Sequence, residues 1–277
     1  MVIVDSRPFE EYQRMNVPTA TDMPGAELAW RIHDLAPDPD TFVVVNCAGR
    51  TRSIIGAQSL INAGIPNPVA ALKDGTMGWH LAGFELERGS TREAAPPSPA
   101  GRRKALAAAS RVAARFGVDA VSPATVAAWL GDSDRTTYLL DVRSPAEYAA
   151  GHLPGYRNAP GGQLVQATDE YIAVRNATVV LADDDGVRAT MTASWLVQMG
   201  WPRVYVLAGG IGGRELQSGT REPTVLGRIG TATVTTEALA AALADDGQVT
   251  VIDLDSSVSY ERCHIPGALW CVRARLS

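Results

Sequence analysis

The chain has 277 residues, of which 46% are hydrophobic and 20% are charged, and its net charge is -5. This composition predicts a soluble globular protein of about two domains, and the negative charge argues against nucleic acid or an anionic membrane as a main partner. No apolar run approaches the ~20 residues that span a bilayer. Its three cysteines are too few and too scattered for a disulfide framework or a metal site. We therefore expect a cytoplasmic protein with no metal ion and no other cofactor.

An internal repeat organises the sequence. The segment 4–12 (VDSRPFEEY) aligns with 140–148 (LDVRSPAEY), and the same alignment places Cys47 on Asp183. A third, partial copy begins near residue 249 and ends before any equivalent of the Cys47 segment. Such self-similarity is typical of tandem domains, and the partial copies predict that the sequence is a segment of a longer series of them.

Short β-branched runs alternate with amphipathic helical segments within each copy. In chain order they include a strand at 43–45, a helix at 100–116 ending at Gly117, a strand at 138–140 and a helix at 190–199. Strands that alternate with helices predict an α/β fold in which a parallel sheet carries helices on both faces. In such folds the ligand lies at the carboxyl ends of the strands.

A Pro/Ser-rich stretch near residues 88–99 separates the first two copies and is typical of a linker. The repeat then predicts four parts of the chain. They are a short first domain (1–88), a linker with a helix (89–118), a second domain (119–224) and the first half of a third (225–277).

The most informative stretch follows the strand at 43–45. Cys47 comes directly after Asn46, a Gly/Arg loop follows, and an apolar helical pattern resumes at Ile54. Backbone N–H groups at a helix start stabilise an anion, and Arg50 and Arg52 favour the thiolate in the same way. A buried structural cysteine is the alternative for a lone Cys, but a cationic loop is a poor place for an inert thiol. Cys47 is thus predicted to be a reactive thiolate.

These motifs together resemble the rhodanese (sulfurtransferase) family, tandem multidomain type. They are Asp-x-Arg with Glu-Tyr, the Gly-His-Leu-Pro-Gly at 151–155, the strand-Cys-loop-helix segment and the Gly-rich stretch at 75–84. The resemblance implies that Cys47 carries sulfane sulfur as a persulfide, taken from a donor such as thiosulfate and passed to cyanide or a thiol. It also implies that the loop forms a substrate-binding cradle of Ala48, Gly49, Arg50, Thr51, Arg52 and Ser53.

The copies depart from this pattern in two places. The second copy has Asp183 where the nucleophile belongs, and a carboxylate cannot carry a persulfide, so we expect that domain to be inactive. The first copy has Met-Asn-Val-Pro-Thr at 15–19 in place of Gly-His-Leu-Pro-Gly, which should alter stability more than chemistry. Both copies keep the Asp-x-Arg pair (Asp5 and Arg7, Asp141 and Arg143), which favours a buried ion pair bracing the sheet.

Two other functions compete with sulfur transfer. A Cys-dependent phosphatase also uses a Cys-loop-Arg cradle, but its signature arginine falls one position later, where this chain has Ser53. A non-catalytic binding or regulatory array fits residues 119–277 and fits the first domain poorly. The partial third copy is expected to pack on the second domain or on another chain, as in a homo-oligomer. Cys263 and Cys271 neither follow a strand nor open a helix, so they are predicted to have no catalytic role.

Overall fold

The computed structural model describes residues 1–220, 232–244 and 249–272, and these fall into two compact units, residues 1–221 and 222–277. The predicted boundary between residues 224 and 225 lies outside the described residues. Among the helices described, none is both long and apolar enough to cross a membrane.

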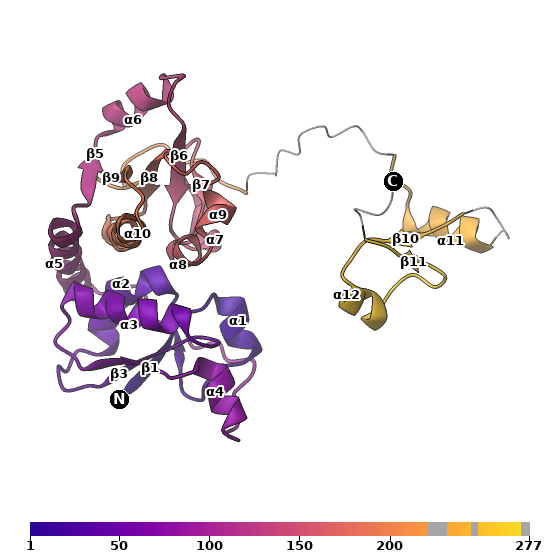
Figure 1. Ribbon diagram of the computed structural model, residues 1–277, viewed down its shortest axis with the longest axis horizontal. Helices are drawn as coiled ribbons and strands as arrows, with labels where there is room; N and C mark the ends of the chain where they lie inside the picture. Colours follow the sequence, from indigo (N-terminus) through magenta and orange to yellow (C-terminus); the bar gives the residue numbers. More distant parts are fainter. Residues whose placement is uncertain (221–231, 245–248, 273–277) are drawn as a thin grey trace. The chain divides into compact units, whose positions relative to one another are not determined.

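The first unit contains two lobes, each built on a parallel sheet (Figure 1). The first lobe has strand order β2-β1-β3-β4. Its elements are β1 (Val2–Asp5), α1 (Phe9–Arg14), β2 (Thr21–Asp22), the 3-10 turn η1 (Gly25–Glu27), α2 (Leu28–Leu35), β3 (Val43–Asn46), α3 (Thr51–Ala63), β4 (Val69–Ala71) and α4 (Gly75–Leu81).

The helix α5 (Pro99–Phe116) connects this lobe to the second lobe, whose strand order is β5-β9-β8-β6-β7. The elements of the second lobe are β5 (Asp119–Val121), α6 (Pro123–Leu130), β6 (Thr137–Asp141), α7 (Pro145–Ala150), β7 (Arg157–Asn158), α8 (Gly161–Gln166), α9 (Thr168–Tyr171), β8 (Thr178–Ala182), α10 (Val187–Gln198) and β9 (Val204–Leu207). The predicted α/β fold with parallel sheets is confirmed, and so is the helix that ends at Gly117, whose φ is 68°.

Ser-Pro pairs begin three of these helices. In α5, α6 and α7 the hydroxyls of Ser98, Ser122 and Ser144 each accept a hydrogen bond from the backbone N–H three residues further on. The proline that follows has no N–H to leave unpaired and is preset to the helical φ. These local signals fix where the helices start and therefore where the strands that follow them run.

Strand residues of the second lobe alternate between two covered faces. Leu140 and Leu181 pack against α8 and α10, whereas Leu139 and Val180 pack beneath α6. In the first lobe, Val4, Val43 and Val45 pack against α2 and α3. This alternation follows from the two-residue period of a strand.

The lobes meet through α2, α3, α5, α8, α10 and η1, which lie between the two sheets (Figure 1). Alanines make the close approach possible: Ala105 and Ala109 of α5 pack with Trp30 and Val187 in one buried cluster. The backbones of Gly25 and Gly162 also touch, since a Cβ on either would lie about 3.3 Å from the Cα of the other.

The second unit contains α11 (Thr236–Ala244), β10 (Ile252–Asp253), α12 (Ser257–Arg262) and β11 (Leu269–Trp270), with β10 and β11 parallel. One tyrosine contact occurs in all three copies. The hydroxyls of Tyr12, Tyr148 and Tyr260 each donate to the carbonyl eight residues later. The partial third copy thus repeats a local structure of the first two.

Candidate active site

Cys47 lies at the carboxyl end of β3, in the loop that leads into α3. Its side chain is 2% exposed, and Sγ lies 3.5 Å from the hydroxyl oxygen of Ser53 in the first turn of the helix. That hydroxyl donates to the carbonyl of Arg50 at 2.9 Å, which closes the loop onto the helix. The predicted strand-loop-helix arrangement is therefore present, with the sulfur at the helix start.

The first turn of α4 holds the Cys47 loop in place through backbone hydrogen bonds. The N–H groups of Thr76 and Met77 donate to the carbonyls of Cys47 and Ala48, both at 2.9 Å. Gly75 precedes them with φ of 57°, and a Cβ at this position would lie 2.3 Å from the carbonyl oxygen of Cys47. Because the Gly75 backbone touches the loop, the Gly-rich stretch that follows β4 sets the position of the cysteine.

The Asp-x-Arg pair braces the strands beneath the site. Arg7 Nη2 donates to Asp5 at 2.8 Å and to the carbonyl of Met15 at 2.6 Å, and both charged side chains are buried. Asp5 also accepts from the Asn46 amide at 2.8 Å, which ties β1 to the end of β3. The equivalent pair, Asp141 and Arg143, is buried as well, so the predicted ion pairs are confirmed.

The two arginines of the loop have different environments. Arg52 is held by Glu11 of α1, with its two terminal nitrogens each 2.7 Å from a carboxylate oxygen. Hydrogen bonding from Arg52 holds the pKa of Glu11 below its usual value. Arg50 is exposed and makes no side-chain ion pair with any described residue. No local pattern in the sequence singles out Glu11, although the same pairing recurs in the second lobe between Glu147 and Arg188.

In the second lobe the equivalent loop holds the Asp183 carboxylate. It accepts hydrogen bonds from the backbone N–H groups of Gly186, Arg188 at 2.8 Å and Ala189 at 3.2 Å. Burial raises the pKa of Asp183 to about 6, although the Arg188 charge and these N–H groups act in the opposite direction. The carboxylate thus occupies an anion cradle formed by the start of α10.

The repeat places Arg50, Arg52 and Ser53 at the positions of those three donors. The backbone N–H groups of Arg50, Arg52 and Ser53 therefore correspond to the groups that donate to the Asp183 carboxyl in the second lobe.

The second loop is also covered by the first lobe. The Arg188 side chain is fully buried, lies 2.6 Å from Glu27 Oε1, and its guanidinium carbon is 4.2 Å from the centre of the Trp30 ring. Asp185 accepts from Trp30 Nε1 at 3.1 Å and from Arg102 of α5 at 2.8 Å. This loop therefore acts as an interlobe contact and leaves Asp183 without access to solvent.

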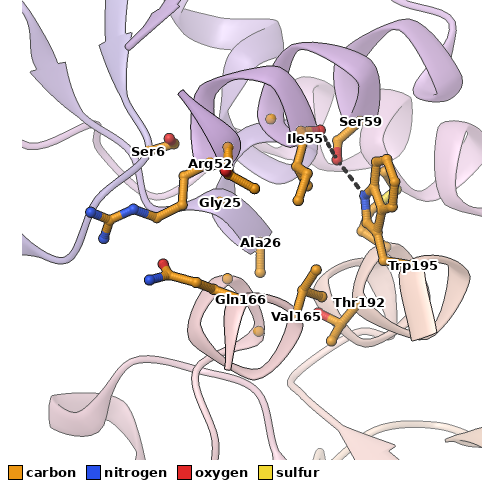
Figure 2. Close-up of a pocket in the computed structure, with 15 residues that line it drawn as sticks. Ser6, Gly25, Ala26, Arg52, Ile55, Ser59, Val165, Gln166, Thr192 and Trp195 are labelled. Atoms are coloured by element: carbon orange, nitrogen blue, oxygen red, sulfur yellow. Dashed lines mark hydrogen bonds between the residues drawn. The ribbon is translucent and has the colours of Figure 1, made fainter. Parts of the chain in front are cut away.

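A small cavity of about 40 Å³ lies between the lobes beside α3. Figure 2 shows Arg52, Ile55 and Ser59 on one side and Val165, Gln166 and Trp195 on the other. Trp195 Nε1 donates to the Ser59 hydroxyl at 2.7 Å and ties the lobes together. The cavity does not include Cys47, and its volume suits about one water molecule rather than a substrate.

The remaining cysteines lie in the second unit. Cys263 is exposed and Cys271 is half-buried, and all three cysteines are free. Within the described part of the chain, no group of three or more His, Cys, Asp or Glu residues is arranged to hold a metal ion.

Comparison with known proteins assigns this architecture to a family. The model of the rhodanese-like domain matches residues 1–82 and 122–213, which include the Cys47 loop and the Asp183 loop. The chain belongs to the rhodanese-like domain family, with two such domains in tandem.

Relatives of this chain include one solved structure of high similarity. The thiosulfate sulfurtransferase from Pseudomonas aeruginosa is 52% identical, with a TM-score of 0.93 over 99% of this chain and 52% of that one. An HTH-type transcriptional regulator of Mycobacterium tuberculosis is 36% identical over 90 residues, covering 32% of this chain and 39% of its own. The protein YqhL of Bacillus subtilis is 37% identical over 76 residues, covering 27% of this chain and 59% of its own. The chain spans about half the length of the Pseudomonas protein.

Proposed function

We propose that the protein is a sulfurtransferase that takes sulfane sulfur from thiosulfate onto Cys47 and passes it to cyanide or a thiol. Its similarity to the Pseudomonas thiosulfate sulfurtransferase supports this class of activity. The observation that carries the proposal is the position of Cys47, at a strand end and facing a helix start, in a loop whose repeat counterpart binds a carboxylate through backbone N–H groups.

The proposed reaction has two displacements at sulfur. The Cys47 thiolate attacks the outer sulfur of thiosulfate, the S–S bond of the donor breaks, and sulfite leaves with the bonding electron pair. Cyanide or a thiolate then attacks the outer sulfur of the persulfide, and the Cys47 thiolate leaves. The first step deposits negative charge on the outer sulfur, where the backbone N–H groups of the loop stabilise it.

The charged side chains have separate roles in this proposal. Arg50 is exposed and unpaired among the described residues, so it is the cation placed to attract the thiosulfate dianion. Arg52 is already bound to Glu11, and it therefore contributes by fixing the first turn of α3. Ala48, Gly49, Thr51 and Ser53 complete the cradle.

A phosphatase fits the loop less well. Its signature arginine would occupy the position of Ser53, whose hydroxyl lies against Cys47. A non-catalytic role fits the second lobe, because a persulfide cannot form on Asp183 and the loop around it is covered. We therefore assign catalysis to the first domain. In this proposal the chain consists of the first domain (1–88), the linker with its helix (89–118), the second domain (119–224) and the partial third domain (225–277).

One panel of assays on the full chain tests this function. Sulfite release from thiosulfate, pyruvate release from mercaptopyruvate and phosphate release from an aryl phosphate are measured on the wild type and on Cys47→Ser. We expect turnover of thiosulfate that Cys47→Ser abolishes, because a serine hydroxyl accepts no sulfane sulfur. Hydrolysis of the aryl phosphate without any sulfur transfer would refute the proposal in favour of a phosphatase.

A further inference from the structure

A larger cleft of about 530 Å³ lies between the lobes, on the side where β1, β2, β6 and β7 end. Its walls combine aromatic and proline side chains with carboxylates, and Cys47 does not line it. The residues used below are Phe9, Glu10, Asp22, Glu93, Asn158 and Tyr171. A concave site of this size between domains is typical of small-molecule binding.

Asp22 is the unusual group of this cleft. The residue is 4% exposed, and its Oδ1 is buried without a hydrogen-bond partner among the described residues. Burial, with the charges of Asp5 and Glu93, raises the pKa of Asp22 to about 8, against the opposing effect of Arg31 and Arg7. A buried polar atom without a hydrogen-bond partner lowers the stability of the folded protein. A ligand that donates a hydrogen bond to the Asp22 carboxyl would therefore stabilise it.

The repeat shows which residue would satisfy this position. Asn158 stands at the equivalent point of the second lobe, and its amide donates to the carbonyls of Asp141 at 3.3 Å and Arg143 at 3.0 Å. An asparagine at position 22 would find the matching carbonyls of Asp5 and Arg7. The first lobe instead has a carboxyl, which can donate neither bond when it is ionised and only one of them when it is protonated. Local rules of stability are typically broken in this way at binding sites.

The charges around Asp22 leave the cleft negative. Arg31 of α2 is bound to Glu27 at 2.6 Å, and it also donates to the carbonyl of Ala94. Glu93 pairs with Asp22 through a parallel backbone bridge, so the two residues are neighbours. Glu93 and Glu10 are exposed, and neither forms a side-chain ion pair with a described residue. Arg31 also lines the cleft, but its guanidinium is engaged by Glu27 and by the Ala94 carbonyl, so among the described residues the carboxylates of Glu10 and Glu93 are left without an opposite charge.

We propose that this cleft binds a small organic cation, an ammonium or amidinium group on a flat apolar body. The cationic N–H groups would donate to Asp22 and Glu93, and the apolar body would lie against Phe9 and Tyr171. An amidinium carries N–H donors on two nitrogens, one for each carboxylate, and aromatic faces attract cations. This proposal concerns a site without Cys47 and does not depend on the sulfurtransferase reaction.

Benzamidine is a suitable probe, because it stays cationic across the pH range used, and benzamide is its neutral counterpart. Calorimetric titration of the full chain at pH 9 should detect benzamidine and not benzamide. Affinity should fall by about tenfold or more between pH 9 and pH 6, since protonation of Asp22 removes the charge that the cation needs.

Asp22→Asn tests the residue directly. It should lose about tenfold or more in affinity for benzamidine while its melting temperature equals or exceeds that of the wild type, because Asn fits this position in the second lobe. Glu85→Gln removes the same charge from an exposed site outside the cleft and should bind like the wild type.

Three results would overturn the proposal. They are equal binding of benzamide, unchanged affinity in a folded Asp22→Asn, and no heat or thermal shift with benzamidine at millimolar concentration. If Asp22→Asn proved unstable, Glu93→Gln would provide the second variant, and an unchanged affinity there would count equally against the site.

Discussion

Replacement of Gly75 by alanine tests whether the turn before α4 positions Cys47. The new Cβ would lie 2.3 Å from the carbonyl oxygen of Cys47 and within 2.8 Å of two backbone atoms of Gly49, and none of these atoms belongs to a flexible side chain. Overpacking of this kind costs about 1–3 kcal/mol. The left-handed φ of 57° adds about 1 kcal/mol for a residue with a side chain. The expected total is about 2–4 kcal/mol.

Gly64→Ala provides the matched control. Gly64 also has a left-handed φ, of 70°, but its nearest neighbours are atoms of the Arg111 side chain at 3.7 and 3.8 Å. This variant should lose about 1 kcal/mol from the backbone alone. The difference between the two variants isolates the contact with the Cys47 loop.

Urea unfolding and sulfite release from thiosulfate measure the two effects. Gly75→Ala should unfold at lower urea than Gly64→Ala, and its rate of sulfur transfer should fall about tenfold or more because the loop must shift. Gly64→Ala should keep the wild-type rate. Equal stability losses together with equal rates would refute the role assigned to Gly75.

Two further predictions concern the first lobe. Thr19 has a left-handed φ of 68°, and the equivalent residues of the other copies are Gly155 and Gly267, both with φ of 81°. Thr19→Gly should therefore stabilise the protein by about 0.5–1 kcal/mol without changing its activity. A lower midpoint in thermal melting would contradict this. Arg50→Ala should raise the KM for thiosulfate about 10- to 100-fold with an unchanged melting temperature, whereas Arg52→Ala should also lower stability because it leaves Glu11 unpaired. Steady-state kinetics with thermal melts measure both arginine variants, and Arg50→Lys, which keeps the charge, should lie between Arg50→Ala and the wild type.

The sequence predicted the features that depend on neighbouring residues. The Asp5 and Arg7 pair spans two positions of the chain, and its recurrence in the second copy identified it as structural. The position of Cys47 at a strand end followed from the β-branched run before it. Local patterns of this kind specify their structure with little help from distant parts of the chain.

Contacts between distant segments were harder to predict. Glu11 meets Arg52 across 41 positions, and only the recurrence of this spacing in Glu147 and Arg188 could have indicated the pair. The sequence indicates at Asp183 only the loss of a nucleophile, whereas in the structure its carboxylate also fills the cradle.

The cleft beside Asp22 forms only when the two lobes pack, which no periodicity of the sequence encodes. The repeat nevertheless marks the position in the sequence, because it aligns Asp22 with Asn158.

The central claim is that Cys47 carries the transferred sulfur, and mass spectrometry of the full chain after thiosulfate treatment tests it most directly. Cys263 and Cys271 serve as internal controls, because they are free and more exposed than Cys47. We predict a mass gain of one sulfur atom that is removed by cyanide, is located on the peptide containing Cys47 and is absent from Cys47→Ser. Sulfur found only on Cys263 or Cys271, or no gain from any sulfane donor, would contradict the account.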